Sequence, residues 1–334
     1  MMHSTLSGVP ARLTGRFQTS ALRWAVAPLL ISAGLLTASC SPSRIDGEEG
    51  SAAKVSKEPG KPGPTPPIDP VPAPCKKVDV LFVIDNSGSM ADNQQSLIAS
   101  FPGFVDGMKK YLASAEDVHI GVVTSDSYYQ NDPACTAIGS LVTKTGGPKS
   151  SGKRCDPYDS GSRFLTTRDP LLKERFACAA QVGAGGSDDE RMARALLDAV
   201  APKAAAPGKC NAGFLRPDSL LVVVMITDED DVPDGCDGDG KCASYGSGGT
   251  PDDWYAEFLR YRPKPENVVV LSLLGRRADN PCGAVPASRL MRFTNKFGSN
   301  AFLGDICAST YDQFFVDALP VISSACSIFL PPPG

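Results

Sequence analysis

Residues 220–227, which read LLVVVMIT, constrain the fold of this chain more than any other segment. A strand with one face in water alternates apolar and polar residues, whereas a strand covered on both faces has no need to alternate. An unbroken apolar run is therefore typical of a central strand in a parallel sheet, with helices packed on both sides. Residues 78–84 (VDVLFVI) have nearly the same character, so the chain is expected to contain a parallel sheet.

Further strands and helices alternate along the chain. Apolar residues recur at helical spacing between the strands, which indicates helices that pack against the sheet. We predict strands at residues 78–84, 118–124, 164–166, 220–227, 267–274 and near 301. We predict helices at residues 97–112, 171–182, 191–204, 251–260, 288–297 and 311–324. This alternation predicts an α/β fold, a doubly wound and mostly parallel sheet with helices on both faces, stabilised by disulfides.

The N-terminal segment has the pattern of an export signal. Arg12, Arg16 and Arg23 precede the apolar residues 24–36, and small residues then lead to Cys40. Residues 36–40 (LTASC) resemble the lipobox of bacterial lipoproteins, in which the cysteine is lipidated, and plain secretion is the alternative. We expect a signal peptide at 1–40, a Pro- and Gly-rich disordered linker at 41–74, one domain at 75–328 and a tail at 329–334.

The cysteine count supports export. Eleven cysteines are present, and ten remain when Cys40 is set aside, an even number that implies disulfides in an exported chain. His119 is the only histidine after the signal and no C-x-x-C pair occurs, which argues against a Cys/His zinc site. Connectivity stays open from sequence. The pairings that we expect are Cys135 with Cys155, Cys236 with Cys242, Cys282 with Cys307, and Cys75 with Cys326.

The sequence lacks the motifs and charge patterns that are typical of several functional classes. The net charge is −4 and no basic patch stands out, so a nucleic-acid partner is not expected. Neither a G-x-S-x-G nucleophile motif nor a G-x-x-x-x-G-K-[ST] phosphate loop occurs. His119 lies within a strand pattern, where a core or edge position is more usual than a catalytic one. We therefore predict that the chain is not an enzyme, with a hydrolase as a less favoured alternative.

Three oxygen donors follow the first strand directly. Asp85, Ser87 and Ser89 stand at i, i+2 and i+4, so their side chains can converge on one point. Hard oxygen donors suit Mg²⁺ or Ca²⁺. The alternative is that Asp and Ser are ordinary turn residues bonded to their own backbone. Because ligands of open α/β sheets bind at strand ends, the position favours a binding site.

Four segments together resemble a von Willebrand factor type A (vWA) domain over residues 76–328. They are VDVLFVIDNSGSM (78–90), HIGVVTSD (119–126), the Gly-Gly-Ser loop (185–187) and VVVMITDEDD (222–231). The resemblance is greatest to the cysteine-rich, exported bacterial members. It implies a metal-ion-dependent adhesion site (MIDAS) at the C-terminal edge of the sheet, binding Mg²⁺ or else Ca²⁺ or Mn²⁺. Its implied ligands are Asp85, Ser87, Ser89, Ser187 and Asp228. Ser187 stands where the family has a threonine, and Thr166 and Thr167 are alternatives for that position.

The resemblance implies adhesion to a protein partner that offers an Asp or Glu carboxylate. The expected location is the cell envelope, either lipid-anchored at Cys40 on the outer membrane or periplasmic face, or secreted. The alternative is a structural envelope protein with a vestigial metal site.

Three further segments carry weaker expectations. Asp230 and Asp231 could hold a structural Ca²⁺, although a solvated acidic turn is favoured. The insertion at 126–163, with Tyr128, Tyr129 and Tyr158, is expected near the metal edge, where loops often determine specificity. Trp254, Tyr255 and Phe258 are expected to pack in the core.

Overall fold

The computed structural model describes residues 74–231, 235–236, 242–243 and 246–331, with the side chains of 235–236 and 242–243 excluded. The expected signal peptide, Cys40, nearly all of the linker and the last three residues lie outside this range. The strands are β1 (Lys77–Ile84), β2 (Asp117–Thr124), β3 (Leu165–Thr166), β4 (Leu220–Ile226), β5 (Gly235–Cys236), β6 (Cys242–Ala243), β7 (Val268–Leu274) and β8 (Ala301–Asp305). The α-helices are α1 (Ala91–Tyr111), α2 (Leu172–Ala180), α3 (Met192–Val200), α4 (Pro251–Tyr261), α5 (Ser288–Asn295) and α6 (Asp312–Ser327). Short 3₁₀ helices span Pro133–Cys135, Pro265–Asn267 and Gly298–Asn300.

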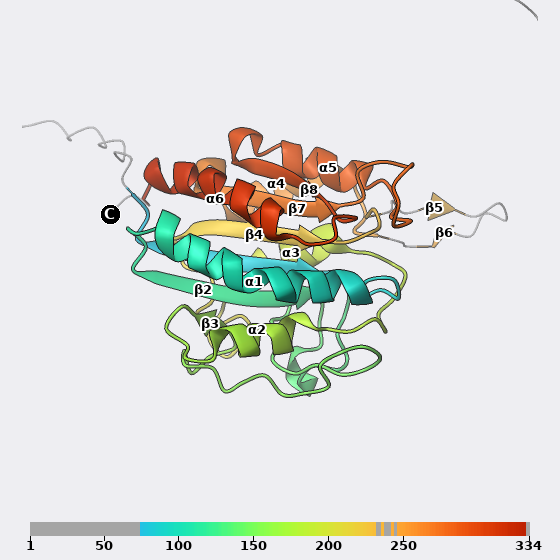
Figure 1. Ribbon diagram of the computed structural model, residues 1–334, viewed down its shortest axis with the longest axis horizontal. Helices are drawn as coiled ribbons and strands as arrows, with labels where there is room; N and C mark the ends of the chain where they lie inside the picture. Colours follow the sequence, from blue (N-terminus) through green and yellow to red (C-terminus); the bar gives the residue numbers. More distant parts are fainter. Residues whose placement is uncertain (1–73, 232–234, 237–241, 244–245, 332–334) are drawn as a thin grey trace, which may run out of the picture. The chain divides into compact units, whose positions relative to one another are not determined.

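Six strands form one sheet in the order β3-β2-β1-β4-β7-β8 (Figure 1). Every pair is parallel except β2 with β3, which is antiparallel. The predicted doubly wound and mostly parallel α/β fold is therefore confirmed. Ile84 at the end of β1 pairs with Thr124 of β2 and Ile226 of β4, so three neighbouring strands end at one edge.

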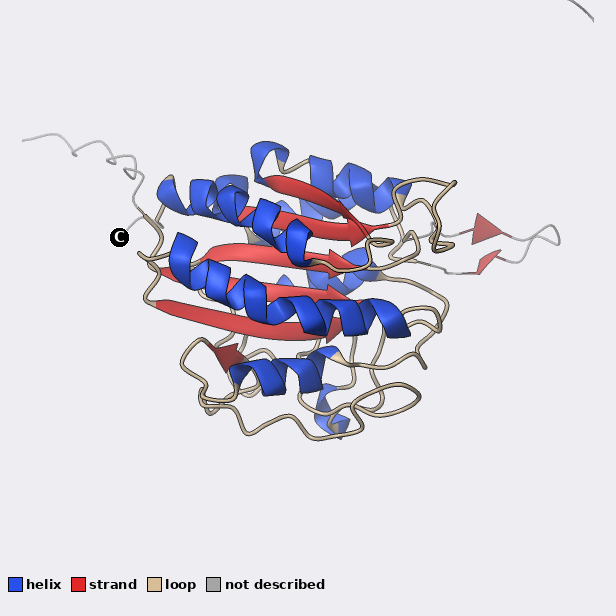
Figure 2. Ribbon diagram, in the orientation of Figure 1, coloured by secondary structure: helices blue, strands red, loops and turns tan. Residues whose placement is uncertain are grey.

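Helices cover both faces of the sheet (Figure 2). On one face, Val80 and Phe82 of β1 pack with α1, α2 and α6. On the other face, Leu81 and Val83 pack with α3, α4 and α5. The alternate residues of β1 thus enter two separate apolar layers, which explains why the strand shows no polar alternation. Trp254 and Phe258 of α4 are buried and Tyr255 packs against the same layer, as the sequence predicts.

Asp79 is the one charged residue inside the apolar run of β1. It is fully buried, and its carboxylate lies 2.6 Å from the Arg216 guanidinium. The backbone N–H of Arg216 and the hydroxyl of Ser219 also donate to Asp79. A buried carboxylate that is paired and hydrogen-bonded in this way satisfies the usual requirement for charge in a protein core. His119 lies beside this cluster, is buried, and its Nδ1 is 2.8 Å from the Phe214 carbonyl, which confirms its core position.

The start of α1 and the end of α3 differ most from the prediction. Helix α1 begins at Ala91, before the first apolar residue of its periodic pattern, because its first turns are polar and carry no periodic signal. Helix α3 ends at Val200, four residues before the predicted end. Ala201 is extended and precedes Pro202, whose ring disfavours a helical conformation in the preceding residue.

Four disulfides are present among the described cysteines. Cys75–Cys326 and Cys282–Cys307 confirm two predicted pairings. The predicted pairing of Cys135 with Cys155 is wrong. These residues pair instead with cysteines farther along the chain, as Cys135–Cys210 and Cys155–Cys178.

The error has a packing cause, because the insertion at 126–163 contacts segments that follow it in the chain. Asn211, beside Cys210, accepts from the backbone N–H of Leu141 at 2.9 Å and donates to the carbonyl of Gly139 at 2.8 Å. Pairing cysteines that are close together in the sequence therefore gives the wrong partner for Cys135. The backbones of Cys236 and Cys242 are paired in register between β5 and β6, and their side chains lie outside the described residues.

Several disulfides indicate that the chain matures in an oxidising, extracytoplasmic compartment. Within the part of the chain that the structure describes, no helix combines the length and apolar character needed to cross a membrane.

The disulfide Cys75–Cys326 closes a span of 251 residues, whereas Cys282–Cys307 closes only 25. If unfolded-chain entropy dominates, replacing both cysteines by alanine should lower the free energy of unfolding by about 5.5 kcal/mol for the long span and about 3.5 kcal/mol for the short one. Denaturant unfolding of the two double variants measures the difference. Equal losses, or a larger loss for the short span, would contradict this account.

Candidate metal centre

Polar residues follow β1, β2 and β4 at the edge where these strands end together. Asp85 follows β1, Ser125 and Asp126 follow β2, and Thr227 and Asp228 follow β4. Backbone hydrogen bonds continue the sheet into this edge. Asp85 N donates to Ile226 O at 3.0 Å, and Ser125 N donates to Ile84 O at 3.2 Å. The parallel register therefore brings residues together that are 142 positions apart in the chain.

Asp85 is the most deeply placed group of this edge and is fully buried. Its Oδ1 accepts from Ser87 N at 2.7 Å and from Ser125 Oγ at 3.4 Å, and its Oδ2 accepts from Thr227 Oγ1 at 2.7 Å. Burial raises the pKa of Asp85 to about 6, although the donors from Ser87 and Thr227 oppose the shift. The negative charge of Asp228 adds to it. The carboxylate is thus firmly oriented in a place that disfavours its charge.

Ser87, Ser89 and Asp228 extend the hydrogen-bonded network from Asp85. The hydroxyls of Ser87 and Ser89 lie 3.4 Å apart, and Ser89 Oγ donates to Asp228 Oδ1 at 3.0 Å. Four of the five residues that the sequence singled out therefore form one cluster. We call Asp85, Ser87, Ser89 and Asp228 the strand-end cluster.

Ser187 lies in an adjoining loop. Its N–H donates to Asp126 Oδ2 at 3.0 Å, and its hydroxyl accepts from Asp189 N at 3.1 Å. Its hydrogen bonds therefore go to Asp126 and Asp189, not to the strand-end cluster. The alternatives Thr166 and Thr167 are wrong for this site. Thr166 pairs with His119 near the start of β2, about 17 Å along the strand from its end at about 3.3 Å per residue.

The loop that carries Ser187 is held close to the strand-end cluster. Gly186 N donates to Asn86 O at 2.8 Å. A Cβ on Gly186 would lie 2.4 Å from Asn86 Nδ2 and 2.7 Å from Asn86 O, so only glycine allows this approach. The Gln94 amide donates to the carbonyls of Asp85 and Gly183, which ties α1 to both loops.

Sequence reasoning missed several residues of this edge. Ser125 directly follows one predicted strand and Thr227 is the last residue of another, and that position was a usable signal. No comparable signal marks Asp126 or Glu190. A Glu shortly before a helix is expected to be exposed. Glu190 is instead only 1% exposed. Asp126 Oδ1 and Glu190 Oε1 are buried and find no hydrogen-bond partner among the described residues.

Asp230 and Asp231 do not form a solvated acidic turn, which corrects the favoured expectation. Both are buried. Asp230 accepts from the backbone N–H groups of Arg289 and Leu290 at 3.0 and 3.2 Å. Asp231 accepts from Ala193 N at 2.8 Å. The two carboxylates therefore satisfy the N-termini of α5 and α3, where negative charge is favourable.

The insertion at 126–163 lies against the loop of Ser187. Ala184 N donates to Pro148 O at 2.8 Å, and the buried Tyr128 hydroxyl donates to Val182 O at 2.6 Å. Tyr129 is 80% exposed and lines a cavity of about 300 Å³ together with Asn86, Asp126 and Ser187. The insertion is therefore placed beside the strand-end cluster, as expected, with one aromatic side chain free at its surface.

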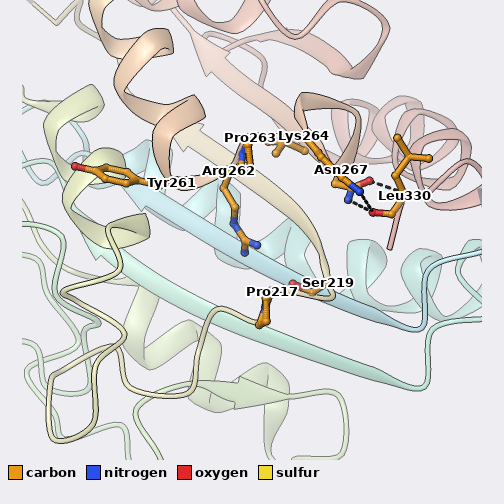
Figure 3. A pocket seen from close by; sticks show the side chains of 9 residues that line it. Pro217, Ser219, Tyr261, Arg262, Pro263, Lys264, Asn267 and Leu330 are labelled. Carbon is orange, nitrogen blue, oxygen red and sulfur yellow. Dashed lines mark hydrogen bonds between the residues drawn. The ribbon is translucent and has the colours of Figure 1, made fainter. Parts of the chain in front are cut away.

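A second cavity, of about 250 Å³, lies at the opposite edge of the sheet (Figure 3). Ser219 and Val268, at the starts of β4 and β7, line it, and Arg262 extends toward Ser219. Arg262 Nη1 donates to the Arg216 carbonyl at 3.0 Å, and Leu330 closes one side through hydrogen bonds to Asn267. This cavity lies beside the Asp79–Arg216 pair and contains none of the residues that the sequence singled out.

The donor set of the strand-end cluster is two carboxylates and two hydroxyls. Among the described residues, no three side chains of His, Cys, Asp or Glu lie close enough together to hold one ion by themselves. A cation at this edge would therefore depend on hydroxyl and water oxygens as well as carboxylates, which is a coordination typical of Mg²⁺.

Comparisons with known proteins assign no family to the chain. No family model matches the chain, and no curated protein matches it. Among solved structures, the chain is similar to proximal thread matrix protein 1 (PTMP1) from the mussel byssus, crystal form 2, with a TM-score of 0.40 and 13% identity. The match covers 75% of this chain and 49% of that chain, so it spans about half of the mussel protein structure.

Two glycines of this edge give a matched test of the loop geometry. Gly186→Ala should lower the free energy of unfolding by about 1–3 kcal/mol, because the new Cβ would collide with Asn86. Gly88→Ala should change it by less than about 0.5 kcal/mol, because no atom lies within 4 Å of the added Cβ. Denaturant unfolding measures both. A Gly186→Ala variant as stable as Gly88→Ala would refute the close contact.

Proposed function

We propose that this chain carries an exported vWA-type domain that binds a protein partner through a divalent cation at the strand-end cluster. One observation carries the proposal. Asp85, Ser87, Ser89 and Asp228 converge at one edge of the sheet through hydrogen bonds of 2.7–3.4 Å, and no described basic side chain neutralises them. Arg191, in the adjoining loop, pairs with Asp189, and Arg216 lies at the opposite edge of the sheet, where it pairs with Asp79.

The residues present fit a cation. Two buried aspartates lie toward opposite ends of β1, and their surroundings differ. Asp79 has the Arg216 guanidinium at 2.6 Å, whereas Asp85 has only neutral donors around it and a second carboxylate, Asp228, nearby. Asp126 Oδ1 is buried at the same edge without a partner. An edge with surplus negative charge and unpartnered carboxylate oxygen suits a bound cation.

Each residue has a role that follows from its chemistry. The hydroxyls of Ser87 and Ser89 would bind Mg²⁺, or else Ca²⁺ or Mn²⁺, directly, and Asp85 and Asp228 would bind directly or through water. Ser187 would contribute its hydroxyl from the adjoining loop. A bound cation supplies an electropositive centre for the Asp or Glu carboxylate of a protein partner. The hydrogen bonds of Asp85 and Gln94 keep the donors oriented, and the insertion forms a rim that can select among partners.

Membrane attachment completes the proposal. Lipidation at Cys40 would anchor the chain in the cell envelope, and the linker at 41–74 would hold the domain away from the membrane surface. The order of the strands and the position of the D-x-S-x-S residues at the carboxyl edge support the vWA assignment. No catalytic role is proposed for this edge.

One observation favours the alternative of a structural envelope protein with a vestigial metal site. The Ser187 hydroxyl accepts a hydrogen bond from Asp189 N and is not bonded to the strand-end cluster. Direct measurement of cation binding by the purified domain separates the two functions, because a vestigial site would show none.

Partner capture should depend on the cation and on Asp85. Immobilised wild-type protein should retain its partner from an extract of producing cells in Mg²⁺, release it in EDTA, and recover it when Mg²⁺ is restored. A short Asp-containing peptide should compete, and the same peptide with Asn should not. Asp85→Ala should capture nothing, whereas Asp106→Ala, which removes an exposed carboxylate of α1, should behave as wild type. Capture that persists in EDTA, or in folded Asp85→Ala, would refute the function.

The exposed Tyr129 offers a test of the rim. Tyr129→Ala should weaken binding of the captured partner by about 1–2 kcal/mol and leave cation affinity unchanged, since exposed aromatic residues often dominate interfaces. Deleting the whole insertion is a poorer test, because it would remove Cys135 and Cys155 from their disulfides. Surface plasmon resonance measures the affinity for the partner, and calorimetry measures the affinity for the cation. A change in cation affinity alone would contradict a role in partner choice.

A further inference from the structure

The cavity of about 250 Å³ at the edge of the sheet opposite the strand-end cluster contains two basic residues and no acidic one. Arg262 and Lys264, which follow α4, both line it (Figure 3). The other residues that line it are uncharged, and Pro217, Val268 and Leu330 give it apolar walls. The cavity therefore combines positive charge with apolar surface, as sites for small organic ligands commonly do.

Arg262 brings a cation to this cavity without an acidic partner of its own. Its Nη1 donates to the carbonyl oxygen of Arg216 at 3.0 Å, and its Nη2 is buried and has no hydrogen-bond partner among the described residues. The buried acid of this edge, Asp79, is paired with Arg216 at 2.6 Å. Burial lowers the pKa of Arg262, and the charge of Asp79 only partly opposes this shift. The guanidinium is thus removed from water without full compensation.

Lys264 adds a second positive charge. Its Nζ donates to the carbonyl oxygens of Leu330 at 3.4 Å and of Pro331 at 2.9 Å. An ammonium group has three N–H donors, so one donor is left for a ligand. The two carbonyls are uncharged, and they leave the positive charge of the lysine without a counter-ion.

A purely structural role does not explain the charge of these two residues. A hydrogen bond to a backbone carbonyl needs an N–H group and no positive charge, so a neutral amide side chain would serve as well. Other partly buried arginines of this protein, Arg163, Arg194 and Arg216, each form an ion pair with an acidic side chain. Arg262 and Lys264 instead face an apolar cavity, which leaves an anionic ligand as the missing partner.

We propose that this cavity binds a small organic carboxylate with an apolar body. The carboxylate would accept from the free N–H of Lys264 and would lie against the guanidinium of Arg262, whose Nη2 becomes available through a small rotation of the side chain. The body would pack on Pro217 and Val268. A cavity of about 150 Å³ holds benzene, so 250 Å³ suits a molecule of the size of phenylacetate. This inference does not depend on the proposed function.

Titration of the purified, methyl-labelled chain with phenylacetate, followed by NMR, tests the proposal. EDTA is present throughout, so that no cation at the strand-end cluster can take the carboxylate. The methyl signals of Val268 and Leu330 should shift and saturate, whereas those of Leu97, on the other face of the sheet, should not. Phenylacetamide, which is neutral and has the same shape, should bind about tenfold or more weakly. Inorganic phosphate should bind less tightly than phenylacetate, because apolar walls cannot replace its hydration.

Three variants assign the binding to the two cations. Arg262→Gln and Lys264→Gln keep a donor for the backbone carbonyls and remove the charge, and each should weaken phenylacetate binding about tenfold. Arg260→Gln is the matched control, because Arg260 is exposed on the last turn of α4 and does not line the cavity. It should bind as wild type does. If Arg262→Gln fails to fold, Lys264→Gln, at a partly exposed position, still provides the test.

Several results would overturn the inference. They are shifts at Val268 and Leu330 that never saturate, equal affinities for phenylacetate and phenylacetamide, and phosphate binding as tight as that of phenylacetate. An equal loss in Arg260→Gln and Lys264→Gln would reduce the effect to general electrostatics and would also overturn it. Binding that occurs only when Mg²⁺ replaces EDTA would place the carboxylate at the strand-end cluster, which would refute this cavity as a site and leave the proposed function standing.

Discussion

The parallel register of β1 with β2 and β4 is the constraint on which the other features depend. Ile84 pairs with both Thr124 and Ile226, so the residues that follow these strands meet at one edge. Each strand can remain parallel only because helices on both faces carry the chain back to the starting edge. The two apolar layers that bury β1 and β4 therefore also determine where Asp85, Ser125 and Thr227 lie.

A buried aspartate lies toward each end of β1, and the two carboxylates have different surroundings. Both Asp79 and Asp85 are fully buried, and burial disfavours a charged carboxylate. Asp79 is neutralised inside the protein by Arg216, which makes the starting edge of the sheet a closed ionic cluster. Asp85 receives only neutral hydrogen-bond donors, and Asp228 adds to its negative surroundings. This asymmetry is the main physical argument for a cation at the carboxyl edge and against one at the other.

The disulfides hold the ends of the domain and the insertion at 126–163, which has little regular secondary structure. Cys75–Cys326 joins a residue two positions before β1 to α6, so the two ends of the domain are held together. Cys135–Cys210 and Cys155–Cys178 fasten the insertion to the segment after α3 and to α2. The insertion has little regular structure of its own, and its hydrogen bonds to Asn211 and to the loop of Ser187 give it a defined place beside the candidate centre.

The sequence by itself determined the α/β class, the order along the chain of the α-helices and of the six strands of the main sheet, and the residues Asp85, Ser87 and Ser89 at a strand end. These features depend on local periodicity and on the apolar runs of residues 78–84 and 220–227, which are visible along the chain. Only the tertiary structure decided the partners of Cys135 and Cys155, the helix-capping use of Asp230 and Asp231, and the burial of Glu190. Those properties depend on contacts between residues far apart in the chain, and composition and spacing carry no record of which surfaces meet.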